Sequence, residues 1–279
     1  MVRRDHARNA ELALLLEVAG TPKPGNVDRR RDHDDLRFEH FLAGAVGSAP
    51  GLRLAGGDGP IGEAFERAVA GMAEQRGGNT QFGALLVLVP LVRAASEGAL
   101  SKGGVRRVCE ATTVDDACTF YRAFEHVDVG VPDPPAGLEP LDVRRGSAAE
   151  PAIRERGLTL FDVLERSASV DGVAREWVEG FPRTFGAAER ITASEGPAPD
   201  RAARVFLELL AAEPDTFVVK RRGPEAAREA SARARAALDG ETDPEALAEA
   251  FVAEGINPGT TADLTAGALF VALERGLPV

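Results

Sequence analysis

Three segments of the chain combine glycine or proline with amide, hydroxyl or charged side chains just before a predicted helix. They are TPKPGNVD at 21–28 together with RDHDD at 31–35, GGNT at 77–80, and NPGTTADL at 257–264. Glycine lets backbone N–H groups approach a ligand closely, and a helix N-terminus presents oriented donors with a partial positive charge, which suits phosphate. The same residues are ordinary helix caps, and for any one segment alone capping is the more frequent explanation. The candidate phosphate-binding residues are Pro24, Gly25, Asn26, Gly78, Asn79, Thr80, Asn257, Gly259 and Thr260.

A cation and several carboxylates belong to the first of these segments. Lys23 lies between two prolines, and a cation fixed in this way would suit a phosphate chain, although a solvated loop lysine is the usual alternative. Asp28, Asp34 and Asp35, with His33 among them, supply the hard oxygens that Mg²⁺ takes beside phosphate oxygens. These residues predict a magnesium–phosphate site. The alternative is a solvated acidic turn that caps the next helix through its dipole.

Further charged residues lie beside other predicted helices. Asp171 is near the start of a helix, where a first-turn acid is the simplest interpretation. Asp215, Lys220 and Arg221 bracket the apolar run at 216–219, and an ordinary ion pair explains them at least as well as a binding site does. The chain has no GxGxxG, GxxxxGK[ST], HExxH or GxSxG motif, so the familiar nucleotide-binding and hydrolase motifs are excluded.

The elements that must position these residues are helices. Apolar residues recur at three- and four-residue spacing almost throughout, alanine is abundant, and alternating β-branched runs are nearly absent. This pattern predicts an all-α protein. Because both halves share it, we expect one compact multi-helix domain over residues 1–279, with the active site where loop–helix junctions converge.

Proline, glycine and capping residues predict the helix boundaries. The first helix ends before Pro22, the second runs from Leu36 to Ala49 and ends at Pro50-Gly51, and the third starts near Asp58. Later helices are predicted at about 81–96, after Ser101, after Thr113, at 159–167, 170–180, 181–193 and 201–212, up to Leu238, before Gly255, and at 261–275. The segment at 127–148, rich in proline and glycine, is predicted to be a long ordered loop or lid.

The composition narrows the class of protein. With 33 Lys+Arg against 44 Asp+Glu the formal net charge is −11, so nonspecific nucleic-acid binding is not expected. Cys109 and Cys118 form no CxxC or Cys/His cluster, and the N-terminus does not resemble an export signal, which favours the cytoplasm. The most apolar stretch, 82–92, is too short to cross a membrane. A homodimer is compatible with these features, but no segment marks an interface.

Five motifs occur in a characteristic order: PKPGNVD, H-x-D, G-x-NT-x-x-G, DTFVVKR-x-G and NPGTTADL. In this order they resemble the triphosphoribosyl-dephospho-CoA synthase family, over about residues 11–275. The resemblance implies an all-α enzyme that uses ATP as a glycosyl donor. Such an enzyme moves the triphosphoribosyl unit of ATP to the 2′-hydroxyl of 3′-dephospho-CoA and releases adenine.

The resemblance also implies roles for the candidate residues. Mg²⁺ bound by the acidic cluster would neutralise the triphosphate, while Lys23 and the N–H groups after Gly78 and Gly259 hold its oxygens. By analogy with glycosidases, two groups must handle protons or stabilise the sugar. The candidates for that work are His33, Asp34, Asp171, Asp215 and Asp263. Asn79 and Asn257 would orient sugar or base groups.

One motif departs from the family pattern. Family members usually carry Asn-Thr-His-Lys-Gly where this chain has Asn-Thr-Gln-Phe-Gly at 79–83, so a cation and a proton-transfer group are missing. The change at Gln81 and Phe82 leaves two alternatives open. One is the same ribosyl transfer to another cofactor precursor, for example a pterin-type compound. The other is a nucleotide-binding paralogue without catalytic activity.

Overall fold

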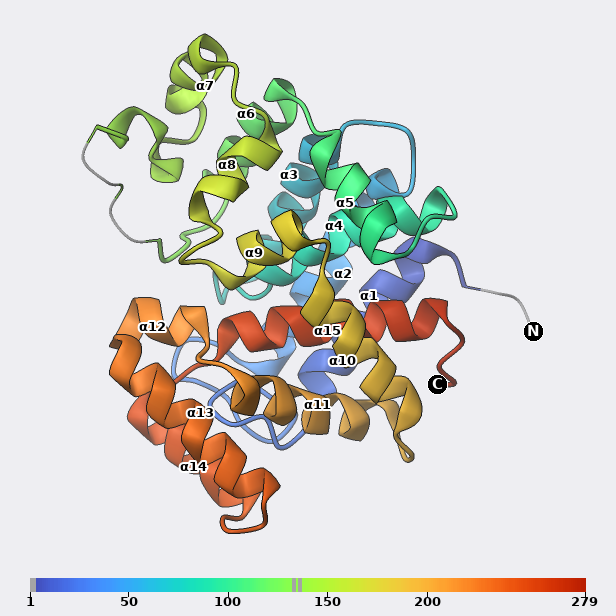
Figure 1. Ribbon diagram of the computed structural model, residues 1–279, viewed down its shortest axis with the longest axis vertical. Helices are drawn as coiled ribbons and strands as arrows, with labels where there is room; N and C mark the ends of the chain where they lie inside the picture. The colour runs from blue at the N-terminus through green and yellow to red at the C-terminus, as the bar shows by residue number, and fades with distance from the viewer. Residues whose placement is uncertain (1–3, 132–133, 135–136) are drawn as a thin grey trace.

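Helices make up the architecture of the computed structural model, which describes residues 4–131, 134 and 137–279 (Figure 1). The first half contains α1 (His6–Ala19), α2 (Phe38–Ala55), α3 (Ile61–Met72), α4 (Phe82–Ser96), α5 (Lys102–Glu110), α6 (Val114–Ala123) and the 3-10 helices η1 (Glu139–Leu141) and η2 (Val143–Ala149). The second half contains α7 (Glu150–Arg156), α8 (Leu160–Ser167), α9 (Gly172–Glu179), α10 (Pro182–Ala193), α11 (Ala198–Ala212), α12 (Thr216–Arg222), α13 (Pro224–Leu238), α14 (Pro244–Glu254) and α15 (Gly259–Glu274). The all-α prediction is confirmed.

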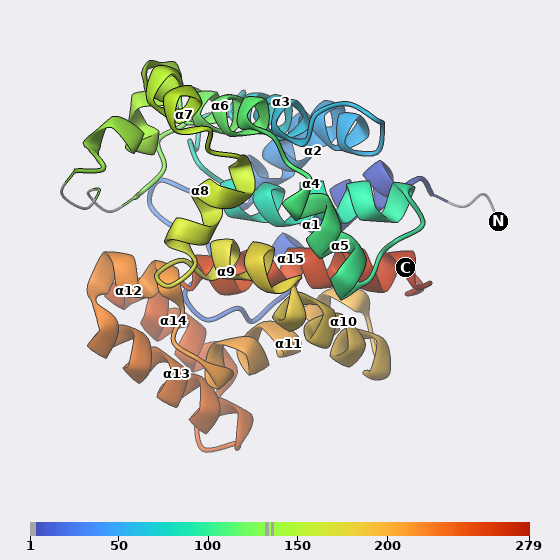
Figure 2. The same ribbon diagram turned by 45° about the horizontal axis from the view of Figure 1, so that its top comes forward.

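The last helix, α15, runs through the middle of the molecule, with other helices above and below it (Figure 2). Every residue from Leu264 to Leu273 is buried, as expected for a helix that is apolar on all sides. Helices α1, α4, α10 and α11 pack directly against it. At one end His6 contacts Glu274 (2.9 Å), which places the start of α1 beside the end of α15. Within the described residues, no helix combines the length and the apolar character that a membrane crossing requires.

A second apolar cluster lies where α11 to α14 pack together, including Phe206, Val218 and Phe251. Helix α11 lines both this cluster and the main core, to which it contributes Ala202 and Val205. This shared helix supports the prediction of one domain over residues 1–279, which stays a prediction.

Helix α2 continues through Pro50-Gly51 to Ala55, so the predicted end at residue 49 is wrong. The reason is tertiary packing against α3. A Cβ atom on Gly51 would meet the backbone of Ala68 at its Cα (2.5 Å) and the Ala64 carbonyl oxygen (2.6 Å), and glycine therefore lets the two helices approach closely. The contact surface on α3 outweighs the backbone hydrogen bond that Pro50 removes.

Other boundaries differ for local reasons. Residues 150–156 form α7, and residues 216–222 form the short helix α12 with Asp215 as its N-cap; neither helix was predicted. Helix α3 begins at Ile61, after Pro60, and α11 begins at Ala198, before its predicted start. Much of the predicted loop at 127–148 forms η1 and η2, while residues 132–133 and 135–136 lie outside the described part.

Candidate active site

The first and third junctions meet. Asn26 donates a hydrogen bond from Nδ2 to Asn257 Oδ1 (3.0 Å), although 231 positions separate the two residues. Beside them Gly25 has a φ of +74° and lies so close to the Ile256 carbonyl that a side chain would collide with it. Glycine is therefore required at position 25 by both backbone conformation and space.

The second junction reaches the same place through the start of α4. A Cβ atom on Gly83 would overlap the Asp263 carboxylate, approaching its Cγ to 2.6 Å. The first turn of α4 thus lies directly against the N-terminal part of α15, at Asp263. The three segments that the sequence singles out converge in space, which independent helix caps would have no reason to do.

Asp263 is surrounded by other carboxylates at this point of convergence. Burial raises its pKa well above the ordinary value of 3.8, and the negative charges of Asp215, Glu17 and Asp171 raise it further, against a hydrogen bond from the Ala84 backbone. We call these four acids the carboxylate cluster. A buried carboxyl group whose pKa is raised is a candidate general acid.

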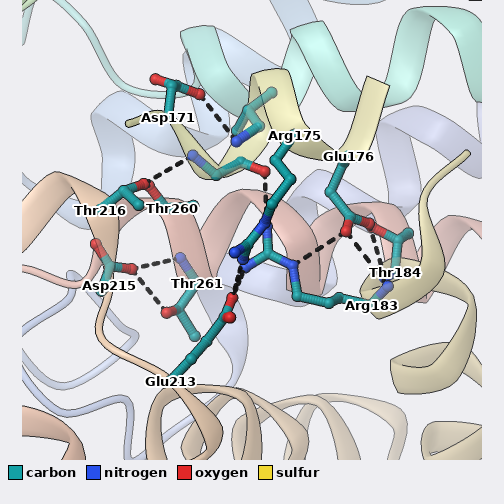
Figure 3. A network of polar contacts seen from close by, with 12 residues as sticks. Asp171, Arg175, Glu176, Arg183, Thr184, Glu213, Asp215, Thr216, Thr260 and Thr261 are labelled. Carbon is teal, nitrogen blue, oxygen red and sulfur yellow. Dashed lines mark hydrogen bonds and ion pairs between the residues drawn. The ribbon is translucent and has the colours of Figure 1, made fainter. Parts of the chain in front are cut away.

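Asp215 ties two helix N-termini together with one side chain (Figure 3). Its Oδ1 accepts hydrogen bonds from the N–H groups of Phe217 (2.8 Å) and Val218 (3.1 Å) at the start of α12. Its Oδ2 accepts from the N–H and the hydroxyl of Thr261 at the start of α15, both at 2.7 Å. Burial raises the pKa of Asp215, while these hydrogen bonds oppose the rise.

Asp171 is the N-cap of α9, just outside the first turn in which it was predicted. Its Oδ1 accepts from the N–H groups of Val173 and Ala174, both at 2.9 Å, and its Oδ2 forms an ion pair with Lys220 from α12. Next to this pair, the Thr216 hydroxyl lies 3.0 Å from that of Thr260 (Figure 3). The starts of α9, α12 and α15 are therefore fixed to one another by polar contacts.

Lys23 forms its contacts with other side chains of the protein interior. Its side chain is fully buried, and Nζ donates to Glu17 Oε1 (2.5 Å) and to Asn26 Oδ1 (3.0 Å). Burial raises the pKa of Glu17, and the charge of Lys23 opposes the rise. Because Asn26 also contacts Asn257, the buried ammonium group links the first and third junctions through Asn26 and does not face solvent.

The acidic residues of the first junction differ in burial and in contacts. Asp28 is fully buried and accepts hydrogen bonds from Arg31 Nη1 (3.1 Å) and from the backbone N–H groups of Lys23 (3.3 Å) and Arg30 (2.8 Å). Asp34 and Asp35 are exposed and make no hydrogen bond or ion pair within the described residues. In that part of the chain no group of three or more His, Cys, Asp or Glu side chains is placed to hold a metal ion.

Four other candidates have local contacts. His33 Nε2 lies 3.1 Å from the Gly25 carbonyl oxygen, so it supports the first junction. Asn79 accepts a hydrogen bond from the Phe82 N–H (3.1 Å), which is the capping alternative. Gly78 is exposed, with φ +70° and open space around it. Arg221 is exposed and lies over the ring of Phe217 (6.0 Å).

A cavity of about 270 Å³ adjoins the polar network. It is lined by Asp215, Thr216, Thr260 and Thr261, together with Arg183 and Glu213. A larger cavity of about 480 Å³ lies between α3, α4, α5 and α6 and contains none of the candidate residues. Of these two, we assign the smaller cavity to the site, because it contacts the polar network.

Comparison with known proteins decides the family. A family model described as ATP:dephospho-CoA triphosphoribosyl transferase matches residues 3–278. The chain belongs to the triphosphoribosyl transferase family. The resemblance predicted from the five motifs is therefore confirmed over nearly the whole chain.

Similar proteins and a similar solved structure carry names that agree with this family assignment. The chain is 29% identical to "Probable 2-(5''-triphosphoribosyl)-3'-dephosphocoenzyme-A synthase" of Pectobacterium carotovorum, over 91% of this chain and 84% of the relative. It is 28% identical to the synthase of the same name from Pectobacterium atrosepticum, with the same coverage. A crystal structure from Archaeoglobus fulgidus, provisionally named a triphosphoribosyl-dephospho-CoA synthase, is similar with a TM-score of 0.70 and 28% identity, covering 86% of this chain and 99% of that one.

The departure at residues 81–82 has a structural basis in this transferase family member. Phe82 is buried and packs against Phe65 and Phe124, with ring centroids 5.1 and 4.8 Å apart. A side chain at position 82 therefore points into the core between α3 and α6. A lysine in this environment would bury an unpaired charge, which explains why an apolar residue fits here.

Sequence reasoning missed two residues of the transferase site. Glu17 lies in the run LLLEVAG, and a single acid in an apolar helical stripe was the available signal. Arg183 had no signal, because its partners belong to two other elements, α9 and the C-terminal end of α11. Its Nε donates to Glu176 Oε1 (3.0 Å), its Nη2 to the Gly172 carbonyl (2.6 Å), and its Nη1 to the Glu213 carboxylate (Figure 3).

We expect Arg183→Lys to lower kcat by about 10- to 100-fold with little change in the KM for ATP. Lysine cannot bond three groups in one plane, so Asp171, next to Gly172, and Asp215, two residues after Glu213, would lose their fixed spacing. Steady-state kinetics would measure both constants. The matched control is Arg175→Lys, since Arg175 contacts Glu213 but not Gly172. Equal losses in both variants would contradict the positioning role.

We expect Gly83→Ala to lower turnover at least about tenfold while the free energy of unfolding changes by less than about 1 kcal/mol. The new methyl group would push away the short side chain of Asp263, which can turn, and alanine is the better helix former. Gly103→Ala is the control, because Gly103 is also the second residue of its helix but has open space around it. Adenine release by Gly83→Ala should therefore fall while its thermal unfolding stays close to that of the wild type. Unchanged turnover in Gly83→Ala would contradict the role of Asp263.

Proposed function

We propose that this protein transfers the triphosphoribosyl unit of ATP to the 2′-hydroxyl of 3′-dephospho-CoA and releases adenine. The observation that carries the proposal is the convergence of three junctions on Asp263, in a chain that belongs to the triphosphoribosyl transferase family. Phosphate-binding loops and a protonated acid are what a reaction at a nucleotide's ribose needs.

The cluster supplies the chemistry of the transfer. The bond from C1′ of the ATP ribose to N9 of adenine breaks, and a bond from C1′ to the acceptor oxygen forms. We assign to Asp263, whose pKa burial raises, the donation of a proton to the leaving base, and to Asp171 the removal of the proton of the acceptor hydroxyl. Negative charge in the cluster stabilises the positive charge that develops on the sugar. Protons balance, since adenine gains one and the acceptor loses one.

The triphosphate needs cations. Lys220 and Arg221 lie in the last turn of α12 and are the side chains we assign to the triphosphate, with N–H groups near Gly259. Asp34 and Asp35 would hold Mg²⁺, which would neutralise phosphate charge when bound. Asp28 does not fit this role, because Arg31 and two backbone N–H groups already occupy its oxygens. We place the reaction in the cytoplasm, and a homodimer stays a prediction.

Adenine release tests the proposal. Purified protein incubated with ATP, Mg²⁺ and 3′-dephospho-CoA should release adenine in proportion to the acceptor consumed. Chromatography would measure the free adenine. The change from the family pattern at Gln81 and Phe82 leaves a second candidate, the same transfer to a pterin-type acceptor, and acceptor competition would identify it. ATP binding without adenine release, with every acceptor, would instead indicate a paralogue without catalytic activity.

A further inference from the structure

The indole of Trp177, in α9, donates a hydrogen bond to the backbone of α4. The side chain is fully buried, and Nε1–H donates to the carbonyl oxygen of Leu86 (2.9 Å), although 91 positions separate the two residues. Within an α-helix this carbonyl would accept from the N–H of residue 90, but residue 90 is a proline and has no N–H. The indole therefore replaces the hydrogen bond that Pro90 removes from α4.

The replacement joins two helices, which an ordinary helical hydrogen bond does not do. A buried carbonyl group without a donor is costly, but any residue other than proline at position 90 would satisfy the Leu86 carbonyl without the indole. In the described part of the chain, no other hydrogen bond joins α9 to α4. Other side chains of α9 bond elsewhere, Glu176 to Thr184 of α10 and Arg175 to Glu213 after α11.

The two joined helices carry the two carboxyl groups to which we assign proton transfer. Asp171 is the N-cap of α9. Asp263 lies against the start of α4, where its carboxylate contacts Gly83 and accepts a hydrogen bond from the Ala84 backbone. Because each helix is a rigid element, a bond between them fixes the start of α9 relative to the start of α4. The spacing of the two carboxyl groups is fixed with it.

We propose that Trp177 is a positioning residue that holds Asp171 at a fixed distance from Asp263 by tying α9 to α4. The inference rests on the proposed function, in which one carboxyl group donates a proton to adenine and the other removes one from the acceptor hydroxyl. Both groups must face the same ribose carbon, and a displacement of about 1 Å can cost about 100-fold in rate. Because the indole is fully buried, it acts through the two helices and not by contact with a substrate.

Two variants separate positioning from simple satisfaction of the carbonyl. Trp177→Phe removes the N–H, so we expect kcat to fall by about 10- to 100-fold, with the KM for ATP within about twofold and a lower Tm. Adding Pro90→Ala supplies a backbone N–H to the Leu86 carbonyl. The double variant should regain a large part of the lost Tm but keep the low kcat, because α9 is still not tied to α4. Recovery of kcat together with Tm would overturn the inference.

A tryptophan analogue removes the donor without changing the shape of the side chain. Trp177 is the single tryptophan of the chain, so benzothienylalanine, in which sulfur replaces the N–H group, can be incorporated at this position alone. We expect a loss of kcat similar to that of Trp177→Phe, without a void in the core. This protein also serves if Trp177→Phe does not fold. A wild-type kcat with the analogue would overturn the inference.

Two further variants serve as controls. Pro90→Ala alone should keep kcat within about twofold of the wild type, because the Leu86 carbonyl has two lone pairs and can accept both N–H groups. Tyr121→Phe removes a comparable bond, from the Tyr121 hydroxyl to the Leu141 carbonyl (2.8 Å), between elements that carry no candidate residue. It should lower Tm and leave kcat unchanged. An equal loss of kcat in Tyr121→Phe and Trp177→Phe would overturn the positioning role.

Hydrogen exchange distinguishes failure of the proposed function from failure of this inference, because it needs no turnover. In the double variant the amides of α9 should exchange at least about fivefold faster than in Pro90→Ala alone, while those of α4 keep their protection. If the wild type releases no base from any substrate pair, the transfer reaction is wrong, and exchange alone decides whether Trp177 ties α9 to α4. Equal exchange of α9 in both proteins would overturn the inference.

Discussion

Replacing Asp263 with Asn is expected to lower adenine release by about 10²- to 10⁴-fold, the usual contribution of a general acid or base. The carboxyl group lies at the convergence of three junctions, against Gly83, and burial together with three neighbouring acids raises its pKa well above the ordinary value. Asparagine keeps the size and hydrogen-bonding shape but has no proton to give. The affinity for ATP should change little, which a calorimetric titration would measure.

The same substitution should stabilise the fold at neutral pH. A carboxyl group whose pKa is raised by folding binds its proton more tightly in the native state, so native stability falls as pH rises from the ordinary value of 3.8 through the raised value. Asparagine does not titrate, so the variant does not lose native stability in this way as the pH rises. Urea unfolding at pH 5 and pH 8 should therefore show a larger advantage of Asp263→Asn at pH 8.

Asp34→Asn is the control for the stability measurement, because Asp34 is exposed and has no partner in the described residues. It should leave stability unchanged at both pH values. If Asp263→Asn released adenine at the wild-type rate, Asp263 would not be the acid, and Asp171 or Asp215 would have to replace it.

The sequence predicted the helices and the three junctions better than it predicted the roles of individual side chains. Helices α4 and α15 could be found because each follows a glycine- or proline-rich segment and is apolar for many residues. The extension of α2 past Pro50 could not, because it depends on glycines at which α2 and α3 touch. Local breakers predict where a helix can end, and only packing decides whether it does.

Side-chain roles failed where the partner comes from a distant element. Asp171 and Lys220 could each be recognised as charged residues at helix ends, but their ion pair requires α9 and α12 to dock. Asp215 could not be recognised as a double cap, since the second helix it caps begins 44 residues later. Lys23 was interpreted as a cation facing a ligand, because nothing local shows that Glu17 approaches it from α1.

Replacing Lys23 with Met is expected to destabilise the protein by about 3–5 kcal/mol, as removal of one partner of a buried ion pair usually does. Glu17 and Lys23 are both buried, and Lys23 also holds Asn26. Without the ammonium, Glu17 must either carry an unpaired charge or take up a proton. Since burial already raises the pKa of Glu17, the loss should be smaller at pH 5 than at pH 8. Urea unfolding at the two pH values measures both effects.

The double variant Glu17→Leu with Lys23→Met separates a structural role for Lys23 from direct contact with phosphate. Two apolar residues of similar volume leave no buried charge, so most of the lost stability should return. If the ammonium only organises the junctions, ATP affinity measured by titration should return with it to within a few-fold. A double variant that folds as stably as the wild type but binds ATP at least about tenfold more weakly would show that Lys23 binds the triphosphate directly. Because Lys23 is fully buried and bonded to Glu17 and Asn26, we expect the first result.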